Sequence, residues 1–435
     1  MMLQRISMRS LRAGIAFFIL LALLSASLHA QDFSRTRPDR LGFDPDRLQQ
    51  MDAVLQSYID NQQIAGSVTL ILKDGRIAYS SAKGMQTIAG SVPMREDSIF
   101  RIASQTKAIV STGIMILHER GVLNIADPLA KFFPEWANAR VGVANPDGGY
   151  TLQRLVRPIN LRDLLTHTSG IGYGGFAGSG VATGAWEQEG ITGWYLASRP
   201  EGIQATVRKM ASLPQRNQPG VEWIYGYNVD ILGAVIEVAS GKSLDEFLKD
   251  EIFTPLGMND THFFLPPEKA SRLTTVYHGM QGGGIEAAPP GPGMGAQGEY
   301  VNGPRATFSG GAGLLSTASD YARFLQMTLN GGEFNGARIL GPKTIELMTT
   351  DHLRGIPFQP GNGFGLGFSV LKDVGARGTM GSVGEYGWGG AYHSTYWVDK
   401  ENNMVVVYLT QILNPNPGLD DFQKLRARLY SSIVE

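Results

Sequence analysis

Hydrophobic and polar positions near the start of the chain predict a helix followed by a β-hairpin. Apolar residues recur at helical spacing over residues 45–61. Two β-rich runs follow, over residues 66–72 and 76–80, and they are joined by Lys73-Asp74-Gly75. Because an Asp-Gly pair between two such runs favours a tight turn, we expect the runs to pair as antiparallel strands.

A second hairpin and a second helix are predicted near the end of the chain. Residues 395–398 and 404–410 are β-rich runs on either side of a polar turn, and residues 419–434 have helical spacing. The middle of the chain, roughly residues 110–300, is richer in helical patterns and loops. We therefore expect an α/β (α+β) fold: an antiparallel sheet built from both ends of the chain and flanked by the terminal helices, with a mainly helical region inserted between them.

Two glycine-dense stretches, residues 170–193 and 281–303, are expected to be loops that can shape a pocket. Residues 293–298, in the second stretch, fit the Gly-x-Gly-x-x-Gly pattern of nucleotide-binding turns. No strand pattern precedes this segment and prolines lie beside it, so we interpret it as a loop and not as a nucleotide site. Neither stretch repeats with a fixed period, which excludes a solenoid.

Composition and charge exclude several classes of protein. The chain has 435 residues with 38 basic and 39 acidic side chains, and no basic block interrupts it, so nucleic acid is not an expected partner. It contains no cysteine, which excludes disulfides, thiolate chemistry and a lipoprotein attachment site. The hydrophobic content of 43% is that of a folded globular protein with a sizeable core.

The N-terminal segment has the pattern of a secretory signal. Arginines precede an apolar run over residues 13–24, and small residues continue to Ala30. We expect a signal peptide over residues 1–30, one domain over residues 31–435, and a periplasmic or secreted protein. Because a leucine stands two places before Ala30, cleavage after Ser27 and retention as a membrane anchor are alternatives. No later apolar run approaches the roughly 20 residues of a membrane span, so none is expected in the mature protein.

Candidate chemistry begins at Ser104-Gln105-Thr106-Lys107, which opens an apolar-periodic segment that runs to about residue 121. Residues three apart share one face of a helix, so the Ser104 hydroxyl and the Lys107 amine are expected to be neighbours. A serine attacks a carbonyl well only when a base takes its proton, and a lysine amine is a base in its neutral form. Taken alone, the same pattern also fits a helix-capping serine with a solvated lysine.

Two later segments add groups that suit the same chemistry. Tyr225 stands in a turn before the helical pattern that begins at Val229, which is a position from which its hydroxyl can reach a pocket. Residues 384–392 lead into the last hairpin and are dense in glycine, which permits close approach of another backbone or a ligand. Together with Ser104 and Lys107 they provide a nucleophile, two proton carriers and an edge of bare backbone amides.

With these motifs the chain resembles the serine β-lactamase and penicillin-binding-protein superfamily, and within it the class C-like branch that includes the family VIII carboxylesterases. The supporting segments occur in family order at residues 100–107, 163–170, 255–261 and 309–317. The resemblance extends from about residue 40 to the C-terminus. It implies a class C β-lactamase-like fold.

The resemblance also implies roles for individual residues. Ser104 is the acylated nucleophile, and Lys107 and Tyr225 form the network that takes its proton and later returns one to the leaving group. Tyr225 is further implied as the group that activates water for deacylation. The oxyanion hole is implied at the backbone N–H groups of Ser104 and of Ala391, the residue after Trp388-Gly389-Gly390.

Two departures from the β-lactamase pattern are informative. Trp388-Gly389-Gly390 stands where the β-lactamases have Lys-Thr-Gly, which removes a cation and a hydroxyl that bind a substrate carboxylate. In place of Tyr-x-Asn, Tyr227 holds the third position and Asn228 follows one step later. Both departures resemble the esterase branch. The predicted substrate-binding residues are therefore Trp388, Gly389, Gly390, Tyr227, Asn228 and His393.

Structural roles are the alternatives for several of these side chains. Tyr227 belongs either to the pocket wall or to the core, and Trp388 either contacts substrate or covers the sheet edge. For His393, the alternative to substrate contact is a position beside the site without a role in binding. His167, in a Thr-His-Thr-Ser-Gly segment, is expected to be structural. No serine lies in a Gly-x-Ser-x-Gly elbow, so an α/β-hydrolase nucleophile is not expected. No His-Glu-x-x-His cluster occurs, so a catalytic metal is not expected, and neither is another cofactor.

The predicted function is an exported serine hydrolase that cleaves carboxylic esters through an acyl-Ser104 intermediate, with weak β-lactamase activity as an accompaniment. β-Lactam hydrolysis as the main activity, and amide or D-amino-acid peptide cleavage, are the enzymatic alternatives. A penicillin-binding or sensory module that is acylated without turnover is the alternative of another class. The expected partner is a small-molecule ester or amide, and the oligomeric state is not predicted.

Overall fold

The computed structural model describes residues 33–175 and 182–434. They belong to one structural unit, Phe33–Glu435. The signal peptide predicted over residues 1–30 lies outside the described residues. In the described ranges, no helix has both the length and the apolar character that crossing a membrane requires.

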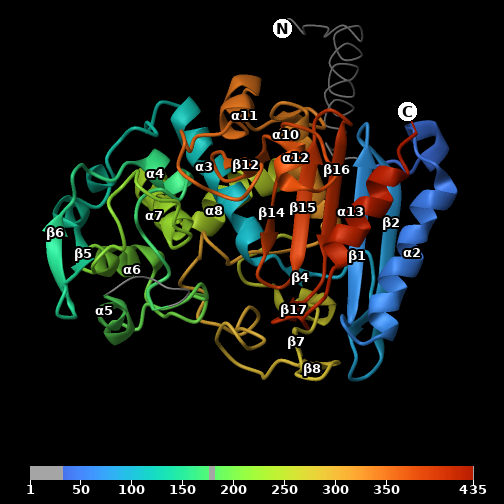
Figure 1. Cartoon of the computed structure of the whole chain (residues 1–435), viewed down its shortest axis with the longest axis horizontal. Helices are drawn as coiled ribbons and strands as arrows, with labels where there is room; N and C mark the ends of the chain where they lie inside the picture. Colours follow the sequence, from blue (N-terminus) through green and yellow to red (C-terminus); the bar gives the residue numbers. More distant parts are fainter. Residues whose placement is uncertain (1–32, 176–181, 435) are drawn as a thin grey trace, which may run out of the picture. The chain divides into compact units, whose positions relative to one another are not determined.

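An eight-stranded antiparallel sheet joins the two ends of the chain (Figure 1). Its strands, in spatial order, are β12 (Asn362–Phe364), β13 (Ser369–Leu371), β14 (Tyr386–Gly390), β15 (Ser394–Asp399), β16 (Met404–Leu409), β1 (Gly66–Lys73), β2 (Arg76–Thr87) and β3 (Val92–Pro93). The two predicted hairpins are confirmed as β1–β2 and β15–β16. They are joined in the middle of the sheet, where Val68 pairs with Leu409 and Lys73 with Met404.

The central strands β1 and β16 are buried along nearly their whole length because helices cover both faces of the sheet. On one face lie the terminal helices, α2 (Pro45–Asp60) and α13 (Asp421–Ser431), whose leucines pack on side chains such as Ile71 and Val406. On the other face α10 (Ala318–Leu329) contacts β1 and β16. The closing helix is shorter than the predicted residues 419–434.

Most of the other helices lie in the inserted region. They are α3 (Thr106–Glu119), α4 (Leu161–Leu165), α5 (Thr183–Gln188), α6 (Ile203–Met210), α7 (Asn228–Ser240), α8 (Leu244–Leu248) and α9 (Thr254–Leu256), with α11 (Pro342–Met348) and α12 (Val374–Arg377) following later in the chain. α3 packs against α7 and is almost entirely buried. Its burial gives the residues at its N-terminus a rigid support.

Short strands outside the main sheet connect these helices. They form the pairs β4 (Phe100–Arg101) with β9 (Leu315–Ser316), β5 (Arg140–Ala144) with β6 (Tyr150–Arg154) and β10 (Glu333–Phe334) with β11 (Ala337–Arg338), and the set β17 (Ile412–Leu413), β7 (Tyr277–Gly279) and β8 (Ile285–Ala287). β4 ends three residues before the candidate nucleophile, Ser104. The glycine-rich residues 293–298 are turns and loop with no helix after them, as expected from their sequence.

Candidate active site

Ser104 lies in a single 3₁₀ turn, Ala103–Gln105, that leads directly into α3. Ala103 has a left-handed backbone with φ 43°, a conformation that L residues other than glycine adopt at a cost. A β-carbon on Gly390 would lie 2.6 Å from the carbonyl oxygen of Ile102, so β14 packs against the backbone just before Ser104 because position 390 is a glycine. The sheet and the nucleophile are thus brought into direct contact.

On the side of β14 away from β15, no strand of the described chain pairs with residues 388–390. β13 pairs with Tyr386 and Gly387 only. Trp388, Gly389 and Gly390 continue past it while remaining paired with β15 on their other side. This part of β14 therefore offers backbone groups to the space above Ser104, as the glycine-dense sequence predicted.

Lys107 is 2% exposed and its amine is held by three oxygen atoms. The Nζ atom lies 3.2 Å from Ser104 Oγ, 3.0 Å from Tyr173 Oη and 2.7 Å from the carbonyl oxygen of Gly311. The Gly311 carbonyl can only accept, so Lys107 donates a hydrogen bond to it, whereas the Ser104 hydroxyl can donate to the amine when the amine is unprotonated. The geometry is that of a serine with a base in hydrogen-bonding reach.

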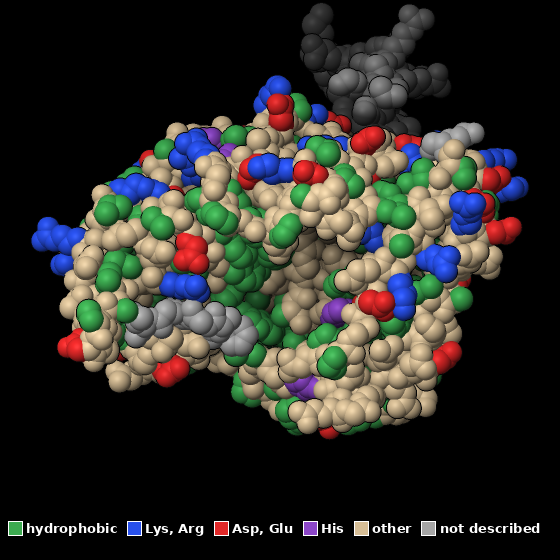
Figure 2. Space-filling model, in the orientation of Figure 1, with side chains coloured by type: hydrophobic (Ala, Val, Ile, Leu, Met, Phe, Trp, Pro, Cys, Tyr) green, Lys and Arg blue, Asp and Glu red, His purple; other side chains and the backbone are tan. Residues whose placement is uncertain are grey.

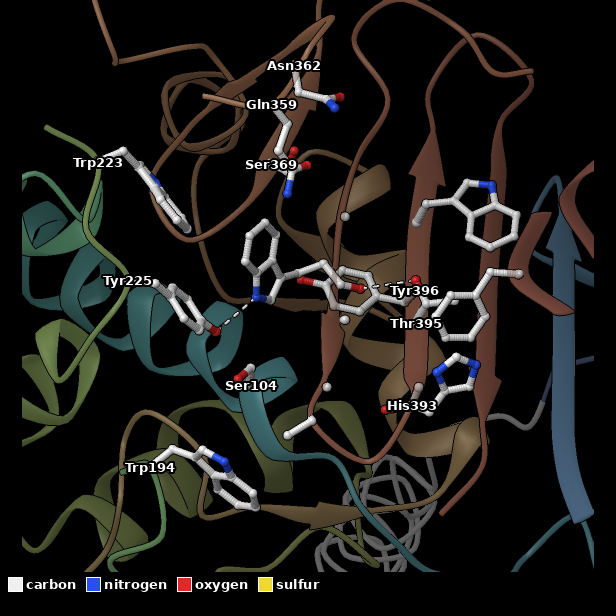
Figure 3. Close-up of a pocket in the computed structure, with 18 of the residues that line it drawn as sticks. Ser104, Trp194, Trp223, Tyr225, Gln359, Asn362, Ser369, His393, Thr395 and Tyr396 are labelled. Carbon is white, nitrogen blue, oxygen red and sulfur yellow. Dashed lines mark hydrogen bonds between the residues drawn. The ribbon is translucent and has the colours of Figure 1, made fainter. Parts of the chain in front are cut away.

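Tyr225 meets Lys107 with its ring face. Lys107 Nζ lies 4.5 Å from the ring centroid, and the Tyr225 hydroxyl accepts a hydrogen bond of 3.0 Å from Trp388 Nε1 (Figure 3). Trp223 stacks on the other side of the Tyr225 ring, with the centroids 5.5 Å apart. Trp388 therefore has two roles: it lines the cleft, and its hydrogen bond fixes the hydroxyl of Tyr225.

Tyr173 is a site residue that no sequence motif identified. It lies in the glycine-rich stretch expected to shape a pocket, and its hydroxyl accepts the hydrogen bond from Lys107. Burial, with Tyr225 and Asp230 nearby, raises the pKa of Tyr173 well above its ordinary value, so the phenol stays protonated. Only the folded chain reveals this contact, because residue 173 is 66 positions from Lys107.

Asp230 fixes the loop that supplies the third partner of Lys107. Its buried carboxylate accepts hydrogen bonds from Ser309 Oγ at 2.6 Å and from the Gly311 N–H at 3.0 Å. A β-carbon on Gly311 would lie 2.2 Å from this carboxylate, so only glycine fits there. Burial raises the pKa of Asp230, and the positive charge of Lys107 partly opposes that rise.

Tyr227 and Asn228 do not line the cleft, which corrects the prediction that they contact substrate. Tyr227 is fully buried and stacks on Trp186. Asn228 begins α7, and its side chain donates to His167 Nδ1 at 2.9 Å and accepts from the Ser169 hydroxyl. Asn228 stands one position later than the asparagine of Tyr-x-Asn, and its side chain stabilises the segment around residue 167.

His167 is buried behind Tyr225, in agreement with its expected structural role. Its ring centroid lies 4.8 Å from that of Tyr225, and it accepts the hydrogen bond from Asn228. Burial, together with the nearby positive charge of Lys107, lowers the pKa of His167 well below its ordinary value. The imidazole is therefore neutral wherever the protein is folded near neutral pH.

This neutral histidine gives a pH-dependent prediction for stability. In the unfolded chain His167 takes up a proton below about pH 6.5, whereas in the folded chain it does not, so its contribution to stability is lost as the pH falls through that value. Replacing it by asparagine, which tolerates the φ of 56° at this position, removes this loss. The melting-temperature advantage of the wild type over His167→Asn should be largest near neutral pH and should shrink by pH 5. A difference that is constant with pH would contradict the assignment.

Ser104 lies at the edge of a cleft of about 970 Å³. Figure 2 shows it as a hollow in the middle of the molecule with hydrophobic side chains along one wall. Its lining includes the predicted Ser104, Tyr225, Trp388, Gly389, Gly390, Ala391 and His393 and the unpredicted Tyr173, Trp194, Trp223, Gln359 and Asn362. Lys107 lies behind Ser104 and is not part of this surface.

The second glycine-rich stretch lies behind the cleft wall. None of its residues borders the cleft; instead, the sulfur of Met294 accepts a hydrogen bond from the backbone N–H of Trp194, which does. Over residues 33–175 and 182–434, no group of three or more His, Cys, Asp or Glu side chains is arranged to hold a metal ion.

The chain is similar to several known proteins. The family model described as Beta-lactamase matches residues 51–429. Esterase EstB of Burkholderia gladioli is 32% identical over 373 residues, 83% of this chain and 89% of the relative. Lovastatin esterase of Penicillium rubens is 29% identical over 406 residues, 85% of this chain and 94% of the relative. The solved structure of EstCE1, a hydrolase with promiscuous acyltransferase activity, has a TM-score of 0.74 and 28% identity, covering 88% of this chain and 99% of that one.

Proposed function

Because the chain belongs to the beta-lactamase family, we propose that it is a serine hydrolase that cleaves carboxylic esters of small molecules through an acyl-Ser104 intermediate. The observation that carries the proposal is the contact of Lys107 Nζ with Ser104 Oγ, 3.2 Å, at the foot of a cleft whose β14 edge is free of cations. Relatives named as esterases support the same substrate class.

Acylation starts from the form of the enzyme in which the Lys107 amine has released its proton; the amine then accepts the Ser104 proton as Oγ bonds to the ester carbonyl carbon. The negative charge that develops on the carbonyl oxygen is stabilised by the backbone N–H groups of Ser104 and Ala391, and one such donor contributes roughly 2.7–4 kcal/mol. The bond to the alcohol oxygen then breaks, and the alcohol leaves with the proton that Lys107 took from Ser104, while the Tyr225 hydroxyl, which borders the cleft, orients the leaving oxygen. The acyl group remains on Ser104.

Deacylation repeats these steps with water as the nucleophile. Tyr225 activates the attacking water by orienting it, and Lys107 accepts one proton from that water. The same backbone donors stabilise the oxyanion, and Lys107 returns the proton to Ser104 Oγ as the acyl bond breaks, which regenerates the free enzyme. The products are the carboxylic acid and the alcohol. No cofactor takes part in this scheme.

Trp388-Gly389-Gly390 is the reason for proposing esters over anionic β-lactams. A charge-assisted hydrogen bond contributes about 1.5–3 kcal/mol, so the absence of a cation here weakens binding of a carboxylate by roughly ten- to hundredfold. Three arginines border the cleft, and each is paired with a carboxylate. Arg377 and Arg426 both bind Glu385, and Arg216 lies 3.4 Å from Glu222. A neutral ester loses nothing by this arrangement.

The test is a comparison of initial rates on one purified sample, with para-nitrophenyl butyrate and a chromogenic cephalosporin as substrates and Ser104→Ala as the blank. We expect ester turnover to exceed cephalosporin turnover by about a hundredfold. Comparable or reversed rates would make β-lactam hydrolysis the primary activity. A label on Ser104 that persists for hours without turnover would instead indicate a penicillin-binding or sensory module.

We also propose that the protein is exported, on the strength of the N-terminal arginines and the apolar run over residues 13–24. Expression of the full chain in a bacterial host, followed by separation of periplasm from cytoplasm and mass determination of the mature protein, tests the location and the cleavage position together. A product retained in the cytoplasm with residues 1–30 intact would refute it.

A further inference from the structure

His393 occupies a position in the β14–β15 connection where glycine would be expected. Three residues join the paired ends Gly390 and Ser394, and the backbone N–H of His393 donates to the Gly390 carbonyl at 3.1 Å. In hairpin loops of this length the last residue is left-handed and is commonly glycine. His393 has φ 56°, so the chain keeps a bulky side chain where its backbone conformation is costly.

The imidazole of His393 is held in one orientation by α13. Its Nε2 lies 2.7 Å from Oδ1 of the buried Asp421, whose other oxygen accepts a 2.8 Å hydrogen bond from the Tyr408 hydroxyl. The ring stacks on Phe422, with centroids 4.1 Å apart and the planes 12° from parallel. A carboxylate that receives a hydrogen bond requires Nε2 to carry the hydrogen, so Nδ1 of the neutral ring presents a lone pair.

The side chain that carries this second nitrogen borders the cleft. His393 borders the same cavity as Ser104, and its side chain is 15% exposed. Figure 3 shows its ring on the α13 side of the cleft, across β14 from Tyr225, with one nitrogen turned toward the strands. In the described part of the chain, no hydrogen bond to Nδ1 is found. The contact with Asp421 thus uses one nitrogen and leaves the other to a ligand.

We propose that His393 binds a hydroxyl group of the substrate, a group separate from the ester that reacts at Ser104. Nδ1 accepts the hydrogen bond, and Asp421 and Phe422 keep the ring in place for it. The natural substrate would then be a hydroxylated ester, with the hydroxyl lying along β14 past the oxyanion hole. This inference rests on the proposed esterase function and adds a substrate class to it.

A purely structural role is the competing explanation. The His393–Asp421 pair also ties the β14–β15 turn to α13, and a tie of this kind would influence every substrate alike. Binding of a hydroxyl, by contrast, affects one substrate of a matched pair. The two explanations are therefore distinguished by the ratio of kcat/KM for the hydroxylated ester to kcat/KM for the plain ester, and not by an absolute rate.

The experiment uses two matched ester pairs that differ by one hydroxyl: para-nitrophenyl butyrate with para-nitrophenyl β-hydroxybutyrate, and propyl butyrate with hydroxypropyl butyrate. The first pair varies the acyl side and the second the alcohol side. His393→Gly relieves the left-handed backbone and removes the ring, so it is compatible with folding. Asn414→Gly is the matched control, since Asn414 also borders the cleft with a positive φ of 45°.

We expect His393→Gly to lower the ratio of hydroxylated to plain ester by about three- to tenfold in at least one pair, the size of one neutral hydrogen bond. Asn414→Gly should keep the wild-type ratio. An unchanged ratio in both pairs for His393→Gly, or an equal fall in Asn414→Gly, overturns the inference while leaving ester hydrolysis intact. Absence of turnover of all four esters by the wild type overturns the proposed function, and this inference with it.

Discussion

Lys107→Met is expected to lower kcat/KM for para-nitrophenyl butyrate by about 10²–10⁴, the usual contribution of a general base. Methionine has a similar length and removes only the amine, which lies 3.2 Å from Ser104 Oγ. Without it, no group of comparable basicity is in hydrogen-bonding contact with the nucleophile in the described part of the chain. Initial rates under substrate-limiting conditions measure the loss directly.

Lys107→Arg is the matched control for charge. A guanidinium stays protonated in proteins, so it preserves the positive charge but cannot accept the serine proton, and it should be as inactive as the methionine variant. Because Lys107 also binds Gly311 and Tyr173, circular dichroism melts must show that both variants are folded. A folded Lys107→Met protein that keeps more than a tenth of the wild-type rate would show that Lys107 is not the base.

The terminal hairpins were predictable because their signals are local. The β-rich run over residues 66–72 and the Asp74-Gly75 turn are contained within a few positions, and so are the equivalents near residue 404. The pairing of Val68 with Leu409, which joins the ends into one sheet, has no local signal. That pairing was expected only from the general rule that apolar strands gather in a shared layer.

The same contrast between local and distant contacts holds within the site. Ser104 and Lys107 are three residues apart at the start of one helix, so their contact follows from helical geometry. Tyr173 and Gly311 reach Lys107 from loops far away in the sequence, and the sequence contains no periodic signal for either. Asn228 was misassigned because the direction of its side chain depends on how one extra residue is accommodated before α7.

Two tyrosines contact Lys107, and they do so differently. Tyr173 accepts a hydrogen bond from the amine through its hydroxyl, whereas Tyr225 offers its ring face and directs its hydroxyl to Trp388. Tyr173 is buried, with its pKa raised well above the ordinary value, so it is poorly suited to cycle a proton. Tyr225 borders the open cleft, where its hydroxyl can meet a leaving alcohol or an incoming water.

Tyr225→Phe should therefore lower kcat by about a hundredfold or more, while Tyr173→Phe should cost only about tenfold, the loss of its one hydrogen bond with the unprotonated Lys107 amine. Because Tyr225 is also the proposed group that activates water, its variant should accumulate acyl-Ser104, detectable by intact-protein mass spectrometry after brief exposure to the ester. Trp388→Phe separates the two contributions of this pair, since it removes the donor to Tyr225 but leaves the phenol in place. If Tyr173→Phe were instead the more damaging change, the proton would have to travel through the buried hydroxyl, and the cleft-facing phenol would serve mainly to position Trp388.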